Sequence, residues 1–488
     1  MRTLSAKANV IDQSSRVIQR QDACFRQVLS ARNAILMYPF LFHPHGETLP
    51  DEIVPANNNR PLRIMAGFFK PGGIYYGWRV AVVAFLSAGF SIGMTHYAFG
   101  VFAEPLETEF GWSRTQLNAG LAVGVLTAAS APIAGRFMDL YGARPVMVVS
   151  LLFVAFGYIF RPLIHDLWHW YALNALVFIG FPGATVLPAG RLAGNWFPNA
   201  KGRMIGVITA GNNFGGLTMV PFATLLITLA GWRWTYFAFG VLLLALAGLA
   251  IVIVRDRPSD VYRARSEHRN REPPADSPTT AITGFELSEV LRLPGFYLVT
   301  IAITAASFTY SAVLTQLIPH LRSQGISEGG AAAALTLVGA MGIVSKIVFG
   351  RLSETITARV AMIISVALQS AGLALLIASD SNAVQWIGIV VFATGFGGFG
   401  ALIVLTISES FGLKAFGSVM GLVQTASAFP MVVGPITVGV LFDRTGDYRL
   451  GFSIILVFFG LAIAMLIASR QRPYHPNRGG SKRANNKH

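Results

Sequence analysis

The sequence predicts an all-α integral membrane protein with twelve transmembrane helices arranged as two pseudo-symmetric six-helix bundles. Three observations predict it: the composition, the long apolar runs and an internal repeat. Of the 488 residues, 53% are hydrophobic and 12% are Asp, Glu, Lys or Arg, whereas a soluble domain carries about 25% charged residues. This composition excludes a disordered chain and argues against a soluble enzyme. Cys24 is the only cysteine, and we expect no catalytic residue, metal or cofactor.

Twelve apolar runs between residues 72 and 469 are long enough for the about 20 residues that a bilayer-spanning helix needs. A polar stretch rich in charge and proline, residues 256–293, divides them six and six. The expected parts are a cytoplasmic N-terminal extension (1–71), an N-terminal bundle (72–255), a cytoplasmic linker (256–293), a C-terminal bundle (294–470) and a basic cytoplasmic tail (471–488). The runs are centred near Ala88, Val125, Phe153, Gly180, Gly215, Leu243, Ala306, Val338, Ser370, Val391, Ala428 and Phe459.

The basic residues predict the orientation. A net charge of +15 would otherwise favour nucleic-acid binding, but residues 1–70 hold nine basic and five acidic residues, and residues 470–488 hold six basic residues and no acid. Most remaining Lys and Arg lie in loops on one side, as in cytoplasmic loops. We therefore expect a multi-pass plasma (inner) membrane protein, both termini cytoplasmic, whose tail binds anionic lipid. No nucleic-acid partner is expected, and the protein is expected to be a monomer.

The first 65 residues do not have the pattern of a signal peptide. Their apolar run, residues 34–42, is too short and lies too far into the chain. Met65 leads directly into the first predicted helix. We expect the mature protein to begin there.

An internal repeat relates the two halves of the chain at an offset of 214 to 216 residues. Duplicated six-helix units are typical of transporters, in which two similar bundles rock about a site near the membrane midplane. The clearest matches are a glycine, an acid and an arginine with identical spacing in each half: Gly135, Asp139 and Arg144, then Gly350, Glu354 and Arg359.

The segment Gly135-Arg-Phe-Met-Asp139-Leu-Tyr-Gly-Ala-Arg144 resembles the signature loop between helices 2 and 3 of the major facilitator superfamily. Gly135 lets its helix approach a neighbour. Asp139 is expected to lie against a helix N-terminus of the opposite half, where the helix dipole favours an anion, and to pair with Arg144. The six repeated residues would then close the cytoplasmic side and release it during transport. The alternative is a plain surface ion pair of Asp139 and Arg144.

Further motifs resemble the monocarboxylate-transporter and oxalate–formate antiporter branch, over about residues 72–470. They are Tyr76-Gly-Trp78, Phe110-Gly-Trp-Ser-Arg114 and Asn195-Trp-Phe-Pro198. The resemblance departs at Ala200, where the branch has a basic residue. It implies a secondary transporter for a small organic anion, a mono- or dicarboxylate. The alternatives are a carrier of a neutral or cationic solute, such as a sugar or drug, and a transporter-like sensor without flux.

Lys346 lies within the eighth predicted span. A charge at the bilayer centre costs at least about 2.5–3.5 kcal/mol, so it is expected to face a cavity or a partner. In the resembled branch a cation at this position, usually Arg, pairs with the substrate carboxylate, and the resemblance implies that role for Lys346. A lysine lacks the bidentate fork of arginine. The alternative is a lysine whose ammonium extends to the cytoplasmic interface.

Seven uncharged or titratable polar residues of other spans are further candidates for contact with the substrate. Since the two adjacent asparagines lie about 100° apart on a helix, only one is expected to face the cavity. The alternative for each residue is a structural contact between helices. The proton-linked carriers of the branch place an aspartate where this chain has Gly342. The alternatives for the mode of transport are therefore anion exchange, uniport, and proton coupling through His96, Lys346 or the substrate itself. The candidates are His96, Tyr97, Asn212, Asn213, Tyr310, Gln316 and Gln424.

Overall fold

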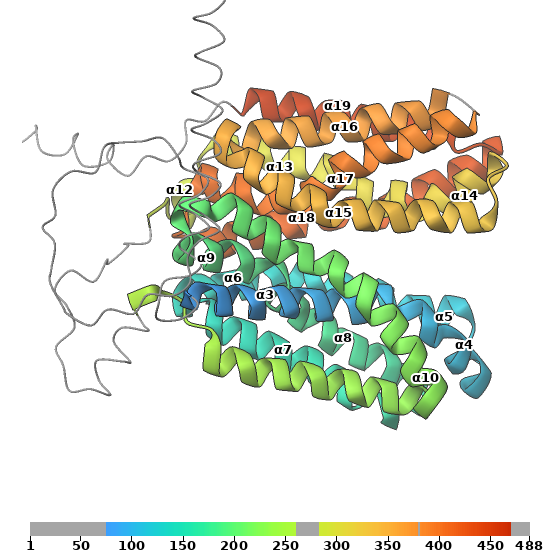
Figure 1. The fold of residues 1–488 in the computed structure, drawn as a ribbon, viewed down its shortest axis with the longest axis horizontal. Helices are drawn as coiled ribbons and strands as arrows, with labels where there is room; N and C mark the ends of the chain where they lie inside the picture. Colours follow the sequence, from blue (N-terminus) through green and yellow to red (C-terminus); the bar gives the residue numbers. More distant parts are fainter. Residues whose placement is uncertain (1–74, 260–282, 379–380, 470–488) are drawn as a thin grey trace, which may run out of the picture. The chain divides into compact units, whose positions relative to one another are not determined.

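The computed structural model describes residues 75–259, 283–378 and 381–469 (Figure 1). Within these ranges the protein is helical, and its β-structure is limited to one bridge between Gly284 and Gly412. Ten spans are long and apolar enough to cross a membrane. The expectations for residues 1–74, including a start at Met65, for residues 260–282 of the linker, and for residues 470–488 lie outside the described residues.

The ten spans account for eleven helices, and a twelfth lies outside them. The longest, Pro198–Ile253, contains two helices that meet at Gly231, whose φ of 79° and ψ of 168° are non-helical. A twelfth helix is divided into Pro294–Ala306 and Leu314–Ser323 by a short π-helical segment. Each of the twelve predicted centres falls within one of these helices. The prediction of an all-α protein with twelve transmembrane helices is confirmed.

Helices of the first half of the chain pack together (Figure 1). Local sequence sets some of their limits: Gly111 ends α4 in the left-handed conformation (φ 65°), and Ser113 caps α5 in a capping box with Gln116. The elements are α3 (Tyr76–Ile92), η2 (Gly93–Tyr97), α4 (Phe99–Phe110), α5 (Arg114–Ala122), α6 (Val125–Tyr141), α7 (Ala143–Ile159), η3 (Arg161–Leu163), α8 (Leu167–Ala184), α9 (Val186–Trp196), η4 (Pro198–Ala200) and α10 (Lys201–Ile253).

Helices of the second half form the other group in Figure 1. Before them, at the end of the predicted linker, Phe285 donates its backbone N–H to the Phe411 carbonyl at 3.1 Å, so this part of the linker is joined to the second half. The elements are α12 (Leu287–Val290), α13 (Pro294–Ala306), η5 (Thr309–Val313), α14 (Leu314–Ser323), α15 (Glu328–Ile356), α16 (Ala358–Ala378), α17 (Asn382–Phe411), α18 (Phe416–Thr445) and α19 (Arg449–Ala468).

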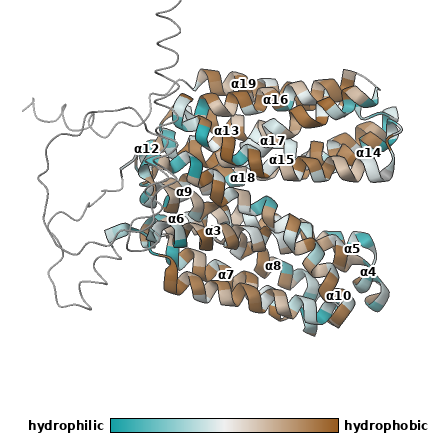
Figure 2. Ribbon diagram, in the orientation of Figure 1, coloured by the Kyte–Doolittle hydropathy of each residue, from teal (hydrophilic) through white to brown (hydrophobic). Residues whose placement is uncertain are grey.

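The outer surface of both groups is apolar. Figure 2 shows hydrophobic residues along α7, α16 and α19, and hydrophilic residues near α12 and α5. Leu229 is 73% exposed and Val457 is 72% exposed. Large apolar side chains are stable in such positions when lipid surrounds them, because a bilayer core needs no polar surface. The fold is therefore consistent with the predicted membrane location.

The first span of each half is interrupted by a π-helical segment at the same place in the repeat. These segments are Gly93–Tyr97 and Thr309–Val313, which lie 216 residues apart at both limits. A π-helical segment inserts a residue into the α-helical ladder, and such segments are frequent at functional sites. The equivalence of the two extends the internal repeat into the middle of the helices.

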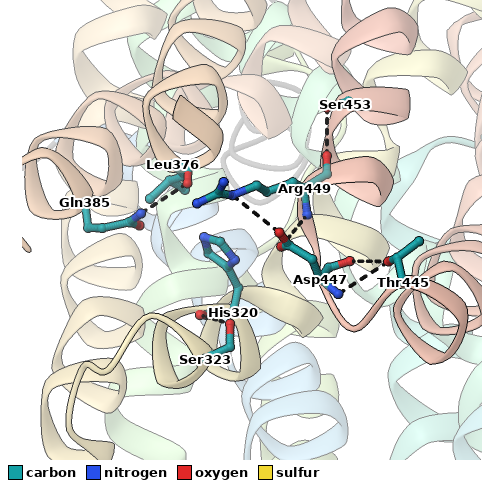
Figure 3. Close-up of polar contacts among 8 residues, drawn as sticks. All are labelled: His320, Ser323, Leu376, Gln385, Thr445, Asp447, Arg449 and Ser453. Carbon is teal, nitrogen blue, oxygen red and sulfur yellow. Dashed lines mark hydrogen bonds and ion pairs between the residues drawn. The ribbon is translucent and has the colours of Figure 1, made fainter. Parts of the chain in front are cut away.

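The repeat also places equivalent arginines at the start of the last helix of each half. Arg233 Nη1 lies 2.5 Å from Glu109 Oε1, and Arg449 Nε lies 3.4 Å from Asp447 Oδ2. Figure 3 shows His320 of α14 beside Asp447 and Arg449, and the His320 side chain is fully buried. In each half, an arginine at the start of the last helix therefore pairs with an acidic residue.

The two halves meet through α6 with α18 and through α10 with α15. Glycines line both contacts. A Cβ atom added at Gly135 would overlap the Gly417 carbonyl, and one added at Gly202 would overlap the Gly350 carbonyl. The absence of side chains at these four positions therefore lets the backbones of opposite halves touch.

Candidate functional site

Lys346 is enclosed between the two halves. It lies on α15, its exposed fraction is 7%, and its Nζ atom donates a hydrogen bond to Oδ1 of Asn213 on α10. A Cβ atom at Gly206 of α10 would overlap the Lys346 carbonyl, so the two helix backbones are close at this point. The side chain leaves α15 where the helices cross. This geometry favours the interior position over a lysine that extends to the interface.

Asn213 bonds to α15 at two places. Besides accepting from Lys346, it donates from Nδ2 to the Gly339 carbonyl at 2.9 Å. Gly339, Gly342 and Lys346 share one face of α15 because they are spaced by three and four residues. A Cβ atom at Gly342 would overlap the Asn213 amide nitrogen. The position where the proton-linked carriers have an aspartate is therefore filled here by an amide from the opposite half.

Tyr310 lies near the Lys346 side chain within the second half. A Cβ atom at Gly400 of α17 would lie 3.1 Å from the Tyr310 hydroxyl and 3.8 Å from Lys346 Cε. The Tyr310 ring packs against Phe396 and Phe399, with centroid distances of 5.3 and 5.8 Å. Because Gly400 has no side chain, the Tyr310 hydroxyl and the Lys346 side chain both border the space beside it.

His96 and Tyr97 lie in the other π-helical segment, η2. Both side chains are exposed, and that of Tyr97 is 48% exposed. The Tyr97 ring lies over Gly216 of α10, while the His96 ring packs against Phe178 and Phe181 at 5.9 and 5.1 Å. Tyr97 and Tyr310 thus come from equivalent π-helical segments of the two halves.

The remaining candidates are less closely tied to Lys346. Asn212 is partly buried, and its Oδ1 atom has no hydrogen-bond partner among the described residues. Gln316 on α14 and Gln424 on α18 are partly exposed. Within the described ranges no recorded hydrogen bond joins either glutamine to Lys346. Of the two adjacent asparagines, Asn213 is the one directed at α15.

A second polar cluster joins the halves at one end of the helices. The Asp139 carboxylate accepts from the Gly417 N–H at 2.8 Å, from the Ser418 N–H at 2.8 Å and from the Ser418 hydroxyl at 2.7 Å. These donors form the N-terminus of α18, which begins at Phe416. An anion there satisfies free N–H groups and interacts favourably with the helix dipole. Asp139 therefore binds a helix N-terminus of the opposite half.

The arginine beside Asp139 differs from the one expected. Arg191 Nη1 lies 3.5 Å from Asp139 Oδ1, and this arginine is 5% exposed. Arg144 instead donates to the Ile251 carbonyl. The reason is local: Arg144 is near the start of α7, next to the C-terminal carbonyls of α10, where a cation is favoured. The sequence spacing gave no indication of Arg191.

The repeat places Glu354 in an equivalent contact. Its carboxylate accepts from the backbone N–H of Arg203 at 2.9 Å and from Arg203 Nε at 2.9 Å. Arg203 is in the first turn of α10, which begins at Lys201. Arg359, the match of Arg144, lies at the start of α16. Each half therefore directs one carboxylate at a helix N-terminus of the other.

Residues 84–435 match the family model described as the Major Facilitator Superfamily. The chain belongs to the Major Facilitator Superfamily. It is thus a multi-pass membrane protein of a transporter family, and the predicted resemblance and two-bundle fold are confirmed.

Two monocarboxylate transporters and one solved structure each match about four-fifths of the chain. Monocarboxylate transporter 2 of Mesocricetus auratus is 23% identical over 424 residues, covering 81% of this chain and 86% of the relative. Monocarboxylate transporter 11 of Homo sapiens is 27% identical over 412 residues, covering 80% and 84%. A crystal structure of a double-tryptophan mutant of XylE covers 82% of this chain and 97% of its own, with a TM-score of 0.68 and 14% identity. The last match shows a shared fold.

The contact of Asp139 with α18 is testable by cross-linking. With Cys24 replaced by serine, cysteines at Ala128 and Thr425 should form a disulfide, because the Thr425 hydroxyl contacts the Ala128 carbonyl at 2.6 Å. Asp139→Asn should slow the formation of this disulfide. A partly buried charge–dipole interaction is worth about 1–2 kcal/mol, so the ratio of closed to open protein should fall about tenfold.

Arg144→Gln is the matched control, since Arg144 lies five residues further along the chain, at the start of α7, and its side chain donates to the Ile251 carbonyl. We expect it to leave the cross-linking rate unchanged. Equal slowing by both variants would contradict the arrangement described.

Proposed function

We propose that the protein is a secondary active transporter that moves a small organic anion, a mono- or dicarboxylate, across the plasma membrane by alternating access. The observation that carries this proposal is the Lys346 ammonium, 7% exposed between the halves and hydrogen-bonded to the neutral Asn213 amide. A buried charge is costly unless it is paired. A substrate carboxylate would supply the opposite charge.

The surroundings of Lys346 suit a small anion. The Tyr310 hydroxyl shares the space beside Gly400 with the lysine stem, and a hydroxyl can donate to a second carboxylate oxygen. Tyr97 and His96, on the equivalent segment of the first half, are exposed and would contact the rest of the molecule. The names of the relatives, monocarboxylate transporters, support the same class of substrate.

Alternating access is supported by where the halves touch. Asp139 and Glu354 bind helix N-termini at one end of the helices, and contacts of this kind can break as a unit when two bundles rock. We infer that this end faces the cytoplasm, because the loops there carry the excess of Lys and Arg. The same reasoning assigns both termini to the cytoplasm.

A carrier of a neutral solute is the alternative. The fold is shared with XylE, which is named a proton:xylose symporter, so the fold alone does not select the substrate. The buried cation favours an anion. Competition by simple carboxylates against the bound solute distinguishes the two, and a lack of exchange of any carboxylate by reconstituted liposomes would favour a sensor without flux.

Lys346→Ala should abolish carboxylate uptake while leaving membrane insertion normal, because the counter-charge is lost. Uptake of labelled pyruvate, lactate and oxalate by liposomes containing the purified protein is the measurement. Lys414→Ala is the control: this lysine forms an exposed ion pair with Glu286 at 2.8 Å, and such pairs contribute little, so uptake should stay within about twofold. Unchanged uptake kinetics in Lys346→Ala would refute the assignment.

Tyr310→Phe should raise the KM for the carboxylate about tenfold or more, since a hydrogen bond to a charged group contributes about 1.5–3 kcal/mol. The maximal rate should change less, because the ring and its packing are kept. Tyr297→Phe, whose hydroxyl donates to the Leu291 carbonyl at 3.0 Å, should leave KM unchanged. Equal KM values for the Tyr310→Phe variant and the parent would show that the Tyr310 hydroxyl does not bind the substrate.

A further inference from the structure

The Asn213 side chain connects the two halves at the cation. It belongs to α10 of the first half, and both of its hydrogen-bond partners, Lys346 and the Gly339 carbonyl, belong to α15 of the second half. Its exposed fraction is 9%. The two partners are seven residues apart, which is two turns of helix. One amide therefore fastens a stretch of α15 to α10.

The surface of α15 between these partners accommodates this amide. Gly342 lies midway, and a Cβ atom there would overlap Asn213 Nδ2. Asparagine offers an acceptor to the ammonium and a donor to the carbonyl at the same time. An aspartate would keep the acceptor and lose the donor, and an alanine would lose both.

We propose that Asn213 is a positioning residue that clamps the two bundles together, and that a substrate carboxylate loosens the clamp by drawing the Lys346 ammonium away from the Asn213 oxygen. The clamp itself depends only on the contacts above. The loosening rests on the proposed function, because it requires an anion at Lys346.

The chemistry gives the direction of the effect. A carboxylate accepts a hydrogen bond from an ammonium more strongly than a neutral amide does, so bound substrate competes with the Asn213 oxygen. Asn213 then keeps only its bond to Gly339. A ligand shifts a conformational equilibrium when it interacts differently with the two states. Substrate binding would therefore favour separation of α10 from α15 and the rocking motion that follows.

The test measures the distance between the halves at the end away from Asp139 and Glu354. Thr115, near the start of α5, and Ala333, near the start of α15, are exposed and belong to opposite halves. Nitroxide labels on cysteines at these positions, with Cys24 replaced by serine, report rocking by pulsed electron paramagnetic resonance. The full chain is studied in lipid nanodiscs, without ligand and with saturating pyruvate, lactate or oxalate.

Without ligand, the parent should give mainly one long distance, and Asn213→Ala should add a population at shorter distance that is at least several-fold larger than in the parent. Asn213→Asp should resemble the parent, since a carboxylate holds the ammonium more tightly, and it should respond less to added carboxylate. Thr218→Ala is the matched control, because the Thr218 hydroxyl donates to the Phe214 carbonyl within α10 at 2.8 Å. It should match the parent.

The outcomes separate the two proposals. If Asn213→Ala gives the parent's distances without ligand, the clamp is refuted, whatever the substrate is. If Asn213→Ala shifts the distances but no carboxylate moves the parent, the clamp stands, while its release by carboxylate fails together with the proposed substrate class. If carboxylates move the parent and Asn213→Asp equally, competition for the ammonium is refuted and the substrate class stands.

Discussion

The contact between the Lys346 ammonium and the Asn213 amide is the interaction on which the candidate site depends. Removing an ammonium from water costs several kcal/mol, and a neutral amide returns only part of that cost. The charge is nevertheless enclosed between the halves. An arrangement of this kind is suited to a ligand that brings its own negative charge, which is why we assign an organic anion to the site.

Close approach of the halves makes this contact possible. Glycines at Gly135, Gly202 and Gly206 let helix backbones of opposite halves touch, and carboxylates bound to helix N-termini hold them at one end. Both kinds of contact are strong at short distance and vanish after a small displacement. They therefore hold one arrangement firmly without preventing another, as a transporter requires.

Much of the fold could be predicted from the sequence. The length of the apolar runs indicates membrane-spanning helices, and the repeat indicates two similar bundles. The segment that resembles the signature loop also led us to expect Asp139 against a helix of the opposite half, and the structure places it there. The arginine partner could not be predicted, since Arg191 and Asp139 are distant in sequence and meet only through tertiary packing. The π-helical segments leave no clear pattern in composition. Asn213 was a candidate, but its bond to Lys346 requires the crossing of α10 and α15.

A structure determined with a bound carboxylate tests the central claim most directly. Our account predicts a carboxylate oxygen within hydrogen-bond distance of Lys346 Nζ and close to the Tyr310 hydroxyl, with the ammonium drawn away from Asn213. A carboxylate bound elsewhere, with the Lys346–Asn213 hydrogen bond intact, would contradict it.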